Sequence, residues 1–262
     1  MRRSFLTPAL WIPAGLAIAL LGLPLVALIV RAPWVQLPEL LSRSEVLQAL
    51  GLSLATASIA TAVSLVLGIP LALVLARSAE WPAVPRRLLR ALVTVPLVLP
   101  PVVGGVALLL LLGRRGLIGQ FLPFQIPFST TAVVIAQVFV AMPFLVLAVE
   151  GAVRASDRRF ETAAATLGAT RWTILRRVTL PLVAPGVSAG ALLCFTRALG
   201  EFGATITFAG SFPGVTQTLP IATYLELQRD PDAAIALSLT LMVVSVAVLV
   251  TLRDRWVPGV TS

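Results

Sequence analysis

Residues 162–181 read Thr-Ala-Ala-Ala-Thr-Leu-Gly-Ala-Thr-Arg-Trp-Thr-Ile-Leu-Arg-Arg-Val-Thr-Leu-Pro and lie between two long apolar runs. The pattern predicts a short alanine-rich helix that a glycine stops, followed by a basic segment that ends in Leu-Pro. A protein that only spans a membrane has no use for such a segment, whereas one that binds a soluble partner at its cytoplasmic face does. The stretch therefore predicts a docking site on a membrane protein.

The composition is that of an integral membrane protein. Apolar residues make up 58% of the chain, charged residues 12%, and the mean hydropathy is +0.99. A soluble domain carries about 25% charged residues. A membrane-crossing helix needs about 20 mostly apolar residues. Six runs meet this requirement, at residues 10–30, 50–76, 88–112, 130–149, 184–208 and 233–252. The sequence therefore predicts an all-α protein of six transmembrane helices.

The first run has a second interpretation as a signal peptide, because Arg2 and Arg3 precede it. Its 21 residues exceed the ~7–15 of a signal sequence's apolar region, and no small-residue cleavage site follows it. We therefore expect it to be retained as a span.

The arginines predict the orientation in the membrane, since all 20 basic residues are arginines. If the N-terminus is cytoplasmic, fourteen arginines fall in inner segments and five in outer segments, and Arg197 lies inside the fifth run. Cytoplasmic loops of membrane proteins carry such an excess. We expect both termini and the long loop at residues 150–183 to be cytoplasmic, and the loop at 209–232, including Thr216, to be outside. Residues 212–221 of that outer loop are a candidate re-entrant or partner-binding segment.

Several kinds of chemistry are excluded by the residues the chain lacks. With no histidine and one cysteine, Cys194, it cannot form a Cys/His zinc site or an internal disulfide. With no lysine it has no phosphate-binding loop of the Walker type. Its eleven carboxylates are scattered, whereas acid–base catalysis needs them in one pocket. We therefore predict no catalytic residue and no metal site, and expect any ATP hydrolysis to take place on another chain.

The cytoplasmic loop predicts two capped helices. Asp157 is a candidate N-cap for a helix over residues 158–167, and Gly168 is its left-handed stop. Thr170 is a candidate cap for a second helix over 171–178, which Leu180-Pro181 would end before the fifth run. The alternative, a solvated basic loop, stays open at this point.

Four elements spread over 20 positions of this loop resemble the EAA loop of ATP-binding-cassette importer permeases: Ala163-Ala164, Gly168, Val178 and Leu180-Pro181. In that family a coupling helix of the loop inserts into a cleft of the ATPase subunit. Two positions depart from the motif, because its Glu is Thr162 here, with Glu161 one place earlier, and its Ile is Val178. The resemblance implies ATPase-coupling residues Glu161, Thr162, Ala163, Ala164, Gly168, Ala169, Arg171, Leu180 and Pro181.

Three further blocks resemble the molybdate permease branch of the same family, at residues 96–103, 113–119 and 197–208. The resemblance implies a type I importer permease (MetI-like) fold, with one permease domain over residues 1–262. It further implies a homodimer, two cytoplasmic ATPase subunits that hold ATP and Mg²⁺, and an extracytoplasmic oxyanion-binding protein. The chain itself would bind no cofactor. A sulfate or tungstate permease of the same fold, and a membrane scaffold without transport, are the alternatives.

The third and fifth runs contain the candidate pathway and gate residues, which are Pro100, Pro101, Arg197, Gly200, Glu201, Gly203, Thr205 and Thr207. Pro96, Pro100 and Pro101 predict an interrupted helix, and freed backbone groups at membrane depth are tolerated only against protein or a water-lined cavity. A packing kink without a conduction role is the alternative. Arg197 and Glu201 are one helical turn apart and predict an ion pair. A structural pair is favoured over direct contact with substrate.

Overall fold

The structure is a computed structural model and describes residues 10–256. Its described residues form helices and connecting segments, with no strand among them. Within this part of the chain, five helical stretches are long and apolar enough to cross a membrane, and a bent helix pair makes a sixth if it is one span. The predicted all-α membrane fold is therefore confirmed. Arg2 and Arg3 lie outside the described residues.

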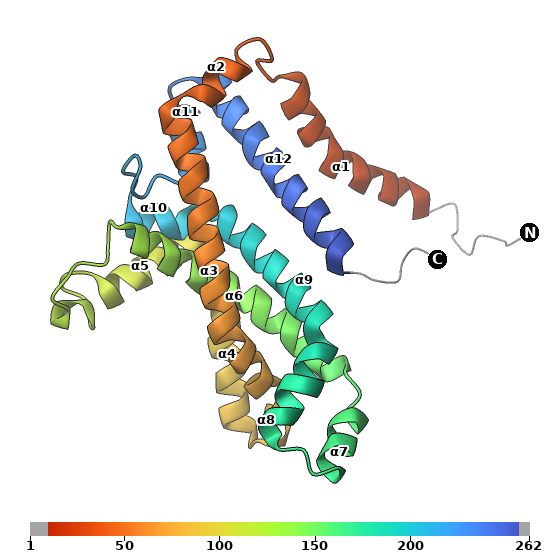
Figure 1. Cartoon of the computed structure of the whole chain (residues 1–262). Helices are drawn as coiled ribbons and strands as arrows, with labels where there is room; N and C mark the ends of the chain where they lie inside the picture. Colours follow the sequence, from red (N-terminus) through yellow and green to blue (C-terminus); the bar gives the residue numbers. More distant parts are fainter. Residues whose placement is uncertain (1–9, 257–262) are drawn as a thin grey trace, which may run out of the picture.

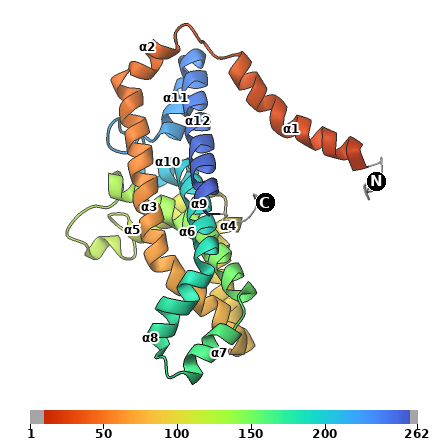
Figure 2. The same ribbon diagram turned by 45° about the vertical axis from the view of Figure 1, so that its right-hand side comes forward.

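The spans match the apolar runs in order. The first, second, fourth and sixth runs form α1 (Trp11–Val30), α3 (Ser44–Arg77), α6 (Thr130–Ala155) and α12 (Pro231–Trp256). Two short helices, α2 (Leu37–Ser42) and α11 (Leu219–Glu226), lie together at one end of the molecule (Figure 1). α1 extends away from the bundle and has no buried residue (Figure 2), and its contact with α12 is small.

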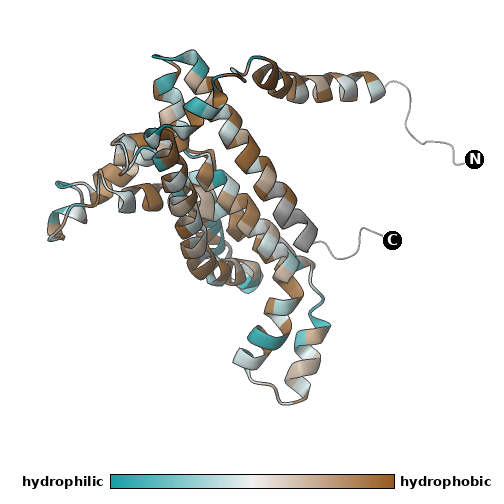
Figure 3. Cartoon of the chain, turned by 45° about the horizontal axis from the view of Figure 1, so that its top comes forward, coloured by the Kyte–Doolittle hydropathy of each residue, from teal (hydrophilic) through white to brown (hydrophobic). Residues whose placement is uncertain are grey.

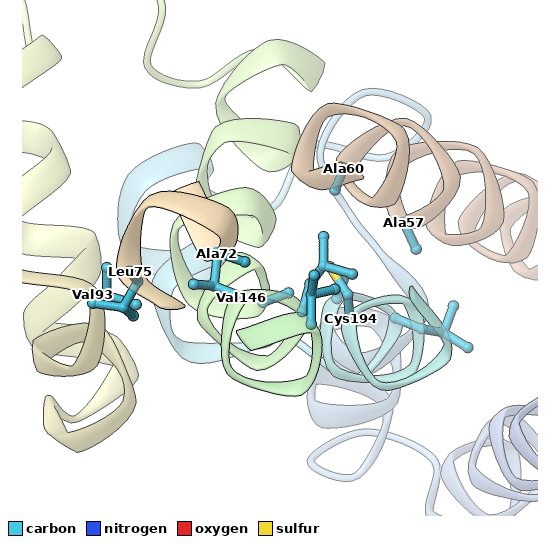
Figure 4. Close-up of a cluster of buried hydrophobic side chains, with 12 residues drawn as sticks. Ala57, Ala60, Ala72, Leu75, Val93, Val146 and Cys194 are labelled. Atoms are coloured by element: carbon cyan, nitrogen blue, oxygen red, sulfur yellow. The ribbon is translucent and has the colours of Figure 1, made fainter. Parts of the chain in front are cut away.

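The core is a three-helix contact in which α6 packs against both α3 and α9 (Leu180–Leu199). A side chain added at Gly68 of α3 or at Gly190 of α9 would lie 3.1 and 3.0 Å from the two methyl groups of Leu145 of α6. Figure 4 shows Ala57, Ala60 and other small side chains gathered in this core. Small residues let helix backbones approach closely in membranes, and so they hold this bundle together.

The third run is not one straight span. The chain bends by 117° between α4 (Ala83–Val98) and α5 (Pro101–Leu112). Leu99 and Pro100 are both extended, with ψ of 133°. Each precedes a proline, and a residue in that position is disfavoured from the helical region. The predicted interruption at Pro100 and Pro101 is confirmed, whereas the prediction for Pro96 is wrong, because Pro96 lies inside α4.

The fifth run, predicted as one helix over residues 184–208, is also divided. α9 ends at Leu199, and a short helix, α10 (Gly203–Ala209), follows after a break at Gly200–Phe202. The Glu201 carboxylate accepts a hydrogen bond of 2.8 Å from the Ala204 N–H and so caps the start of α10. Capping of this kind favours a new helix over continuation of the old one. The prediction of one continuous helix is therefore wrong.

The two ends of the molecule differ in structure. α7 (Arg159–Thr166) and α8 (Arg171–Ile174) form a hairpin that projects from one end, opposite α2 and α11 (Figures 1 and 2). Figure 3 shows hydrophobic residues along the long helices and more hydrophilic ones towards the hairpin. The arginine bias predicts that this hairpin end is cytoplasmic.

The loop between α10 and α11 is a closed turn. Thr216 is fully buried, and its hydroxyl accepts a hydrogen bond of 2.9 Å from the Phe212 N–H. The Thr130 hydroxyl of α6 donates to the Val215 carbonyl, and the Leu219 N–H donates to Ser53 of α3. Although Thr216 lies in the loop that we expect outside, its buried side chain makes it unsuitable for labelling. Val215, which is 43% exposed, is the better site.

Single-cysteine labelling tests the orientation. In a Cys194→Ala background, we expect Val215→Cys to react with an impermeant maleimide only from outside, and Thr170→Cys only from the cytoplasmic side. Thr170 is exposed on the hairpin, so both sites are open to the reagent. Reaction of both from the same side would contradict the arginine-based topology.

Candidate docking surface and pathway

The first helix of the hairpin ends as its sequence predicts. Gly168 has φ of +83°, in the left-handed region. The Gly168 N–H donates to the Ala165 carbonyl and the Ala169 N–H to the Ala164 carbonyl, both at 3.0 Å. This pair of bonds is the Schellman motif, which closes a helix and turns the chain away. At the other end, the Asp157 carboxylate accepts from the Arg159 N–H at 2.9 Å, so the helix begins as predicted to within one residue.

The second helix of the hairpin begins as predicted but does not end at Leu180-Pro181. The Thr170 hydroxyl accepts from the Thr173 N–H at 3.2 Å and caps α8. A π-helical turn at Leu175–Thr179 (η4) then leads directly into α9. Pro181 lies in the first turn of α9, where its missing N–H is tolerated. The predicted break before the fifth run is wrong, and one helical stretch of 29 residues extends from Arg171 to Leu199.

The hairpin exposes an apolar surface at a polar end of the molecule. α7 has no buried residue, and Phe160 on this helix and Leu167 at its C-cap are 58% and 88% exposed. Trp172 of α8 is 68% exposed. The same segment carries exposed arginines: Arg158, Arg159, Arg171, Arg176 and Arg177. An apolar patch with a charged rim is typical of a surface that binds another protein.

Sequence reasoning missed Phe160 and Leu167 as part of this surface. Their spacing, with Ala163 and Ala164 between them, is the i, i+3, i+4, i+7 pattern of one helix face. That pattern was the available signal. Because α7 has no buried residue, its apolar face is left uncovered by the described part of the chain.

The predicted coupling residues lie together on the hairpin and at its base. Thr162, Ala163, Gly168 and Arg171 are exposed, and Ala164 and Ala169 are half-buried. Leu180 and Pro181 lie at the start of α9. Glu161 points back to the bundle, because its Oε1 accepts from the Thr179 hydroxyl at 2.6 Å and pairs with Arg77 at 3.4 Å.

A second polar cluster joins the helices near the hairpin and was not predicted. Glu150 of α6 is buried, and its carboxylate pairs with Arg90 of α4 and, at 2.7 Å, with Arg154. The i, i+4 spacing of Glu150 and Arg154 was visible in the sequence, whereas the contact with Arg90 depends on the fold. This cluster ties the middle of α4 to the hairpin end of α6.

The two helix breaks, which hold the candidate pathway residues, lie against each other. A side chain at Gly203 would come within 2.8 Å of the Pro101 Cβ, and one at Gly105 within 2.7 Å of the Thr207 Cβ. The first turns of α5 and α10 therefore lie side by side with almost no space between them. The structure thus brings Pro101 together with Gly203 and Thr207 of α10, although Pro101 lies far from both in the sequence.

Arg197 and Glu201 form the predicted ion pair, with Nη1 and Oε2 2.6 Å apart. Glu201 lies in the break rather than on the helix, and it is 1% exposed, whereas the Arg197 side chain is 28% exposed. Glu201 thus makes two bonds, one to Arg197 and one to the start of α10. Of the two threonines, Thr207 donates to the Gly203 carbonyl, while the buried Thr205 hydroxyl has no hydrogen-bond partner among the described residues. Pro100 and Gly200 are exposed.

The family of the chain follows from comparison with known proteins. Residues 68–258 match the family described as "Binding-protein-dependent transport system inner membrane component". This match covers more than half of the chain, and the chain belongs to that family.

Individual proteins agree with this assignment. The molybdenum transport system permease protein ModB of Mycobacterium bovis is 50% identical over 248 residues, which cover 94% of this chain and 93% of that protein. The sulfate transport system permease protein CysT of Escherichia coli is 33% identical over 247 residues, covering 90% and 88%. Among solved structures, a bacterial ABC transporter that imports alginate matches with a TM-score of 0.71 at 16% identity, covering 97% and 95%. That likeness confirms the importer-permease fold.

Proposed function

We propose that the chain is the transmembrane permease subunit of an ATP-driven importer for molybdate. The observation that carries the proposal is the 50% identity to a molybdenum permease across nearly the full length of both chains. The hairpin supports the same function, because its exposed apolar surface suits the cleft of a soluble subunit. In this proposal the protein lies in the cell membrane of a bacterium or archaeon, with both termini in the cytoplasm.

The proposed assembly contains two copies of this chain, two ATPase subunits and an extracytoplasmic oxyanion-binding protein. ATP and Mg²⁺ bind to the ATPase subunits, and this chain is not an enzyme. The coupling residues are those of the hairpin, among them Thr162, Ala163, Gly168 and Arg171. The loop at residues 150–183, within one permease domain over 1–262, is the coupling loop.

The structure suggests how movement of the hairpin reaches the pathway. From Arg171 to Leu199 the helix is continuous over 29 residues, roughly 40 Å at the rise of an α-helix. Its far end carries Arg197 and leads into the break that packs against α5. Closure of the ATPase dimer would draw the two hairpins together and turn the pathway outward, and hydrolysis would return it inward.

The second candidate is a sulfate permease of the same fold, which the 33% identity to CysT favours. Tungstate, which has the same charge and shape as molybdate, is a third substrate of this class. A membrane scaffold without transport would need no ATPase partner, and a neighbouring ATPase gene beside one for a secreted binding protein would argue against it.

Uptake by the reconstituted importer tests the proposal. The permease, its ATPase and its binding protein are placed in vesicles, and uptake of labelled molybdate, tungstate and sulfate is measured with ATP. We expect ATP-dependent uptake of molybdate that excess sulfate does not compete away. Uptake of sulfate in preference to molybdate would support the second candidate, and ATP hydrolysis without uptake of any of the three would contradict both.

A further inference from the structure

We propose that Glu161 is the positioning residue that holds the docking helix α7 on the membrane bundle. Thr162, which occupies the position of the motif's glutamate, does not have this role. This inference rests on the proposed function, since positioning matters only if α7 transmits movement. It goes beyond that function by assigning one side chain to the connection between hairpin and bundle.

The first observation is that α7 has little else to hold it. None of its residues is buried, and its main packing neighbours are α8 and the π-helical turn. Burial of apolar surface, which stabilises most packed helices, is therefore small for α7. The orientation of α7 depends on specific polar contacts instead.

The second observation is that one carboxylate oxygen joins three elements. Oε1 of Glu161, on α7, accepts from the hydroxyl of Thr179 at 2.6 Å and pairs with Nη2 of Arg77 at 3.4 Å. Thr179 is 1% exposed and ends the π-helical turn before α9, whereas Arg77 ends α3. Both partners therefore belong to the long helices of the bundle. Hydrogen bonds to charged groups are among the stronger ones in proteins.

The third observation separates Glu161 from its neighbours. The Thr162 hydroxyl donates to the Arg158 carbonyl of its own helix, and the residue is exposed on the hairpin. Arg158 pairs with Glu80 at 3.9 Å, with the side chains 70% and 84% exposed, and such surface pairs contribute little. Glu161, at 27% exposed, is the more protected of the two acidic anchors. The structure thus gives Thr162 to the outer surface and Glu161 to the bundle.

A distance measurement on the permease alone tests the positioning. Spin labels are placed at Ala163 of α7 and at Val84 of α4, both exposed, in a Cys194→Ala background. In the otherwise unchanged protein we expect a narrow distance distribution. Glu161→Ala should broaden it, with roughly a tenfold rise in the population whose α7 has moved away from the bundle, because a hydrogen bond to a charged group is lost. Glu80→Gln, the matched control, should leave the distribution narrow. An unchanged distribution in Glu161→Ala would overturn the proposal, whether or not the chain transports molybdate.

The complete importer supplies the second measurement. With Glu161→Ala, we expect the ATPase to co-purify and hydrolyse ATP, while more ATP is used for each anion imported. Glu161→Gln keeps an acceptor for the Thr179 hydroxyl. Its ratio of ATP used to anion imported should therefore lie between those of wild type and Glu161→Ala. Glu80→Gln, the matched control, should keep the wild-type ratio, because its pair with Arg158 lies on the exposed surface. A ratio equal to wild type in Glu161→Ala would count against the positioning role, whereas a wild type that hydrolyses ATP without uptake would count against the proposed function alone.

Discussion

Replacing Gly168 with valine is expected to abolish ATP-driven uptake while the chain still inserts into the membrane. Gly168 has φ of +83°, and a left-handed conformation costs a residue with a side chain about 1–2 kcal/mol, with β-branched residues affected most. A side chain at this position would meet no atom within 4 Å, so the effect is one of backbone conformation and not of packing. Because α7 has no buried residue to oppose the strain, we expect the hairpin to change shape.

Two variants make this prediction specific. Gly168→Asn should retain most of the uptake, because asparagine tolerates the left-handed region. Gly151→Ala in α6, where a side chain also meets nothing within 4 Å, controls for the loss of a glycine. Uptake and stimulation of the ATPase are measured for all three. If Gly168→Val kept full uptake and normal stimulation, the hairpin would not be the coupling element.

Removing the carboxylate of Glu201 is expected to have the largest effect on folding. Glu201→Leu leaves Arg197 without its partner and the Ala204 N–H without its cap. Breaking a buried ion pair lowers the free energy of unfolding by about 3–5 kcal/mol. Because the Arg197 side chain is 28% exposed, we expect a loss at the lower end of this range. We therefore expect a marked loss of folded protein, measured as the monodisperse fraction after detergent extraction.

The double variant Arg197→Met/Glu201→Gln distinguishes a structural pair from a substrate contact. The glutamine oxygen can still accept the Ala204 N–H, while no charge remains unpaired, so we expect much of the folded protein to return. A double change to Met and Leu lacks this acceptor and should recover less. If the pair is structural, the folded double variant imports molybdate. A well-folded double variant without uptake would indicate that Arg197 contacts the anion.

Much of the fold could be predicted from the sequence because the signals were local. Apolar runs of about 20 residues give spans, and the φ of Gly168 and the cap at Thr170 follow from the residues that adopt those conformations. The ion pair of Arg197 and Glu201 follows from their spacing. The hairpin was found for the same reason, since a motif over 20 positions specifies it.

The remaining features depend on contacts between distant segments. Pro96 stays within α4 although Pro100 does not stay within a helix, and proline alone does not distinguish the two. The π-helical turn that leads into α9 carries Pro181 past the expected break. Thr216 is buried because the turn 212–217 closes on α6 and α3, and Glu161 pairs with Arg77, 84 residues away. None of these contacts leaves a periodic pattern in the sequence.

The central claim, that a separate ATPase docks on the α7–α8 hairpin, is tested most directly by site-specific photocrosslinking in the assembled importer. A photoreactive residue at Leu167, which is 88% exposed on the hairpin, is compared with one at Val35, which is 95% exposed near α2 at the opposite end. We predict that Leu167 crosslinks to the ATPase subunit and that Val35 does not. A crosslink from Val35 and none from Leu167 would contradict the account.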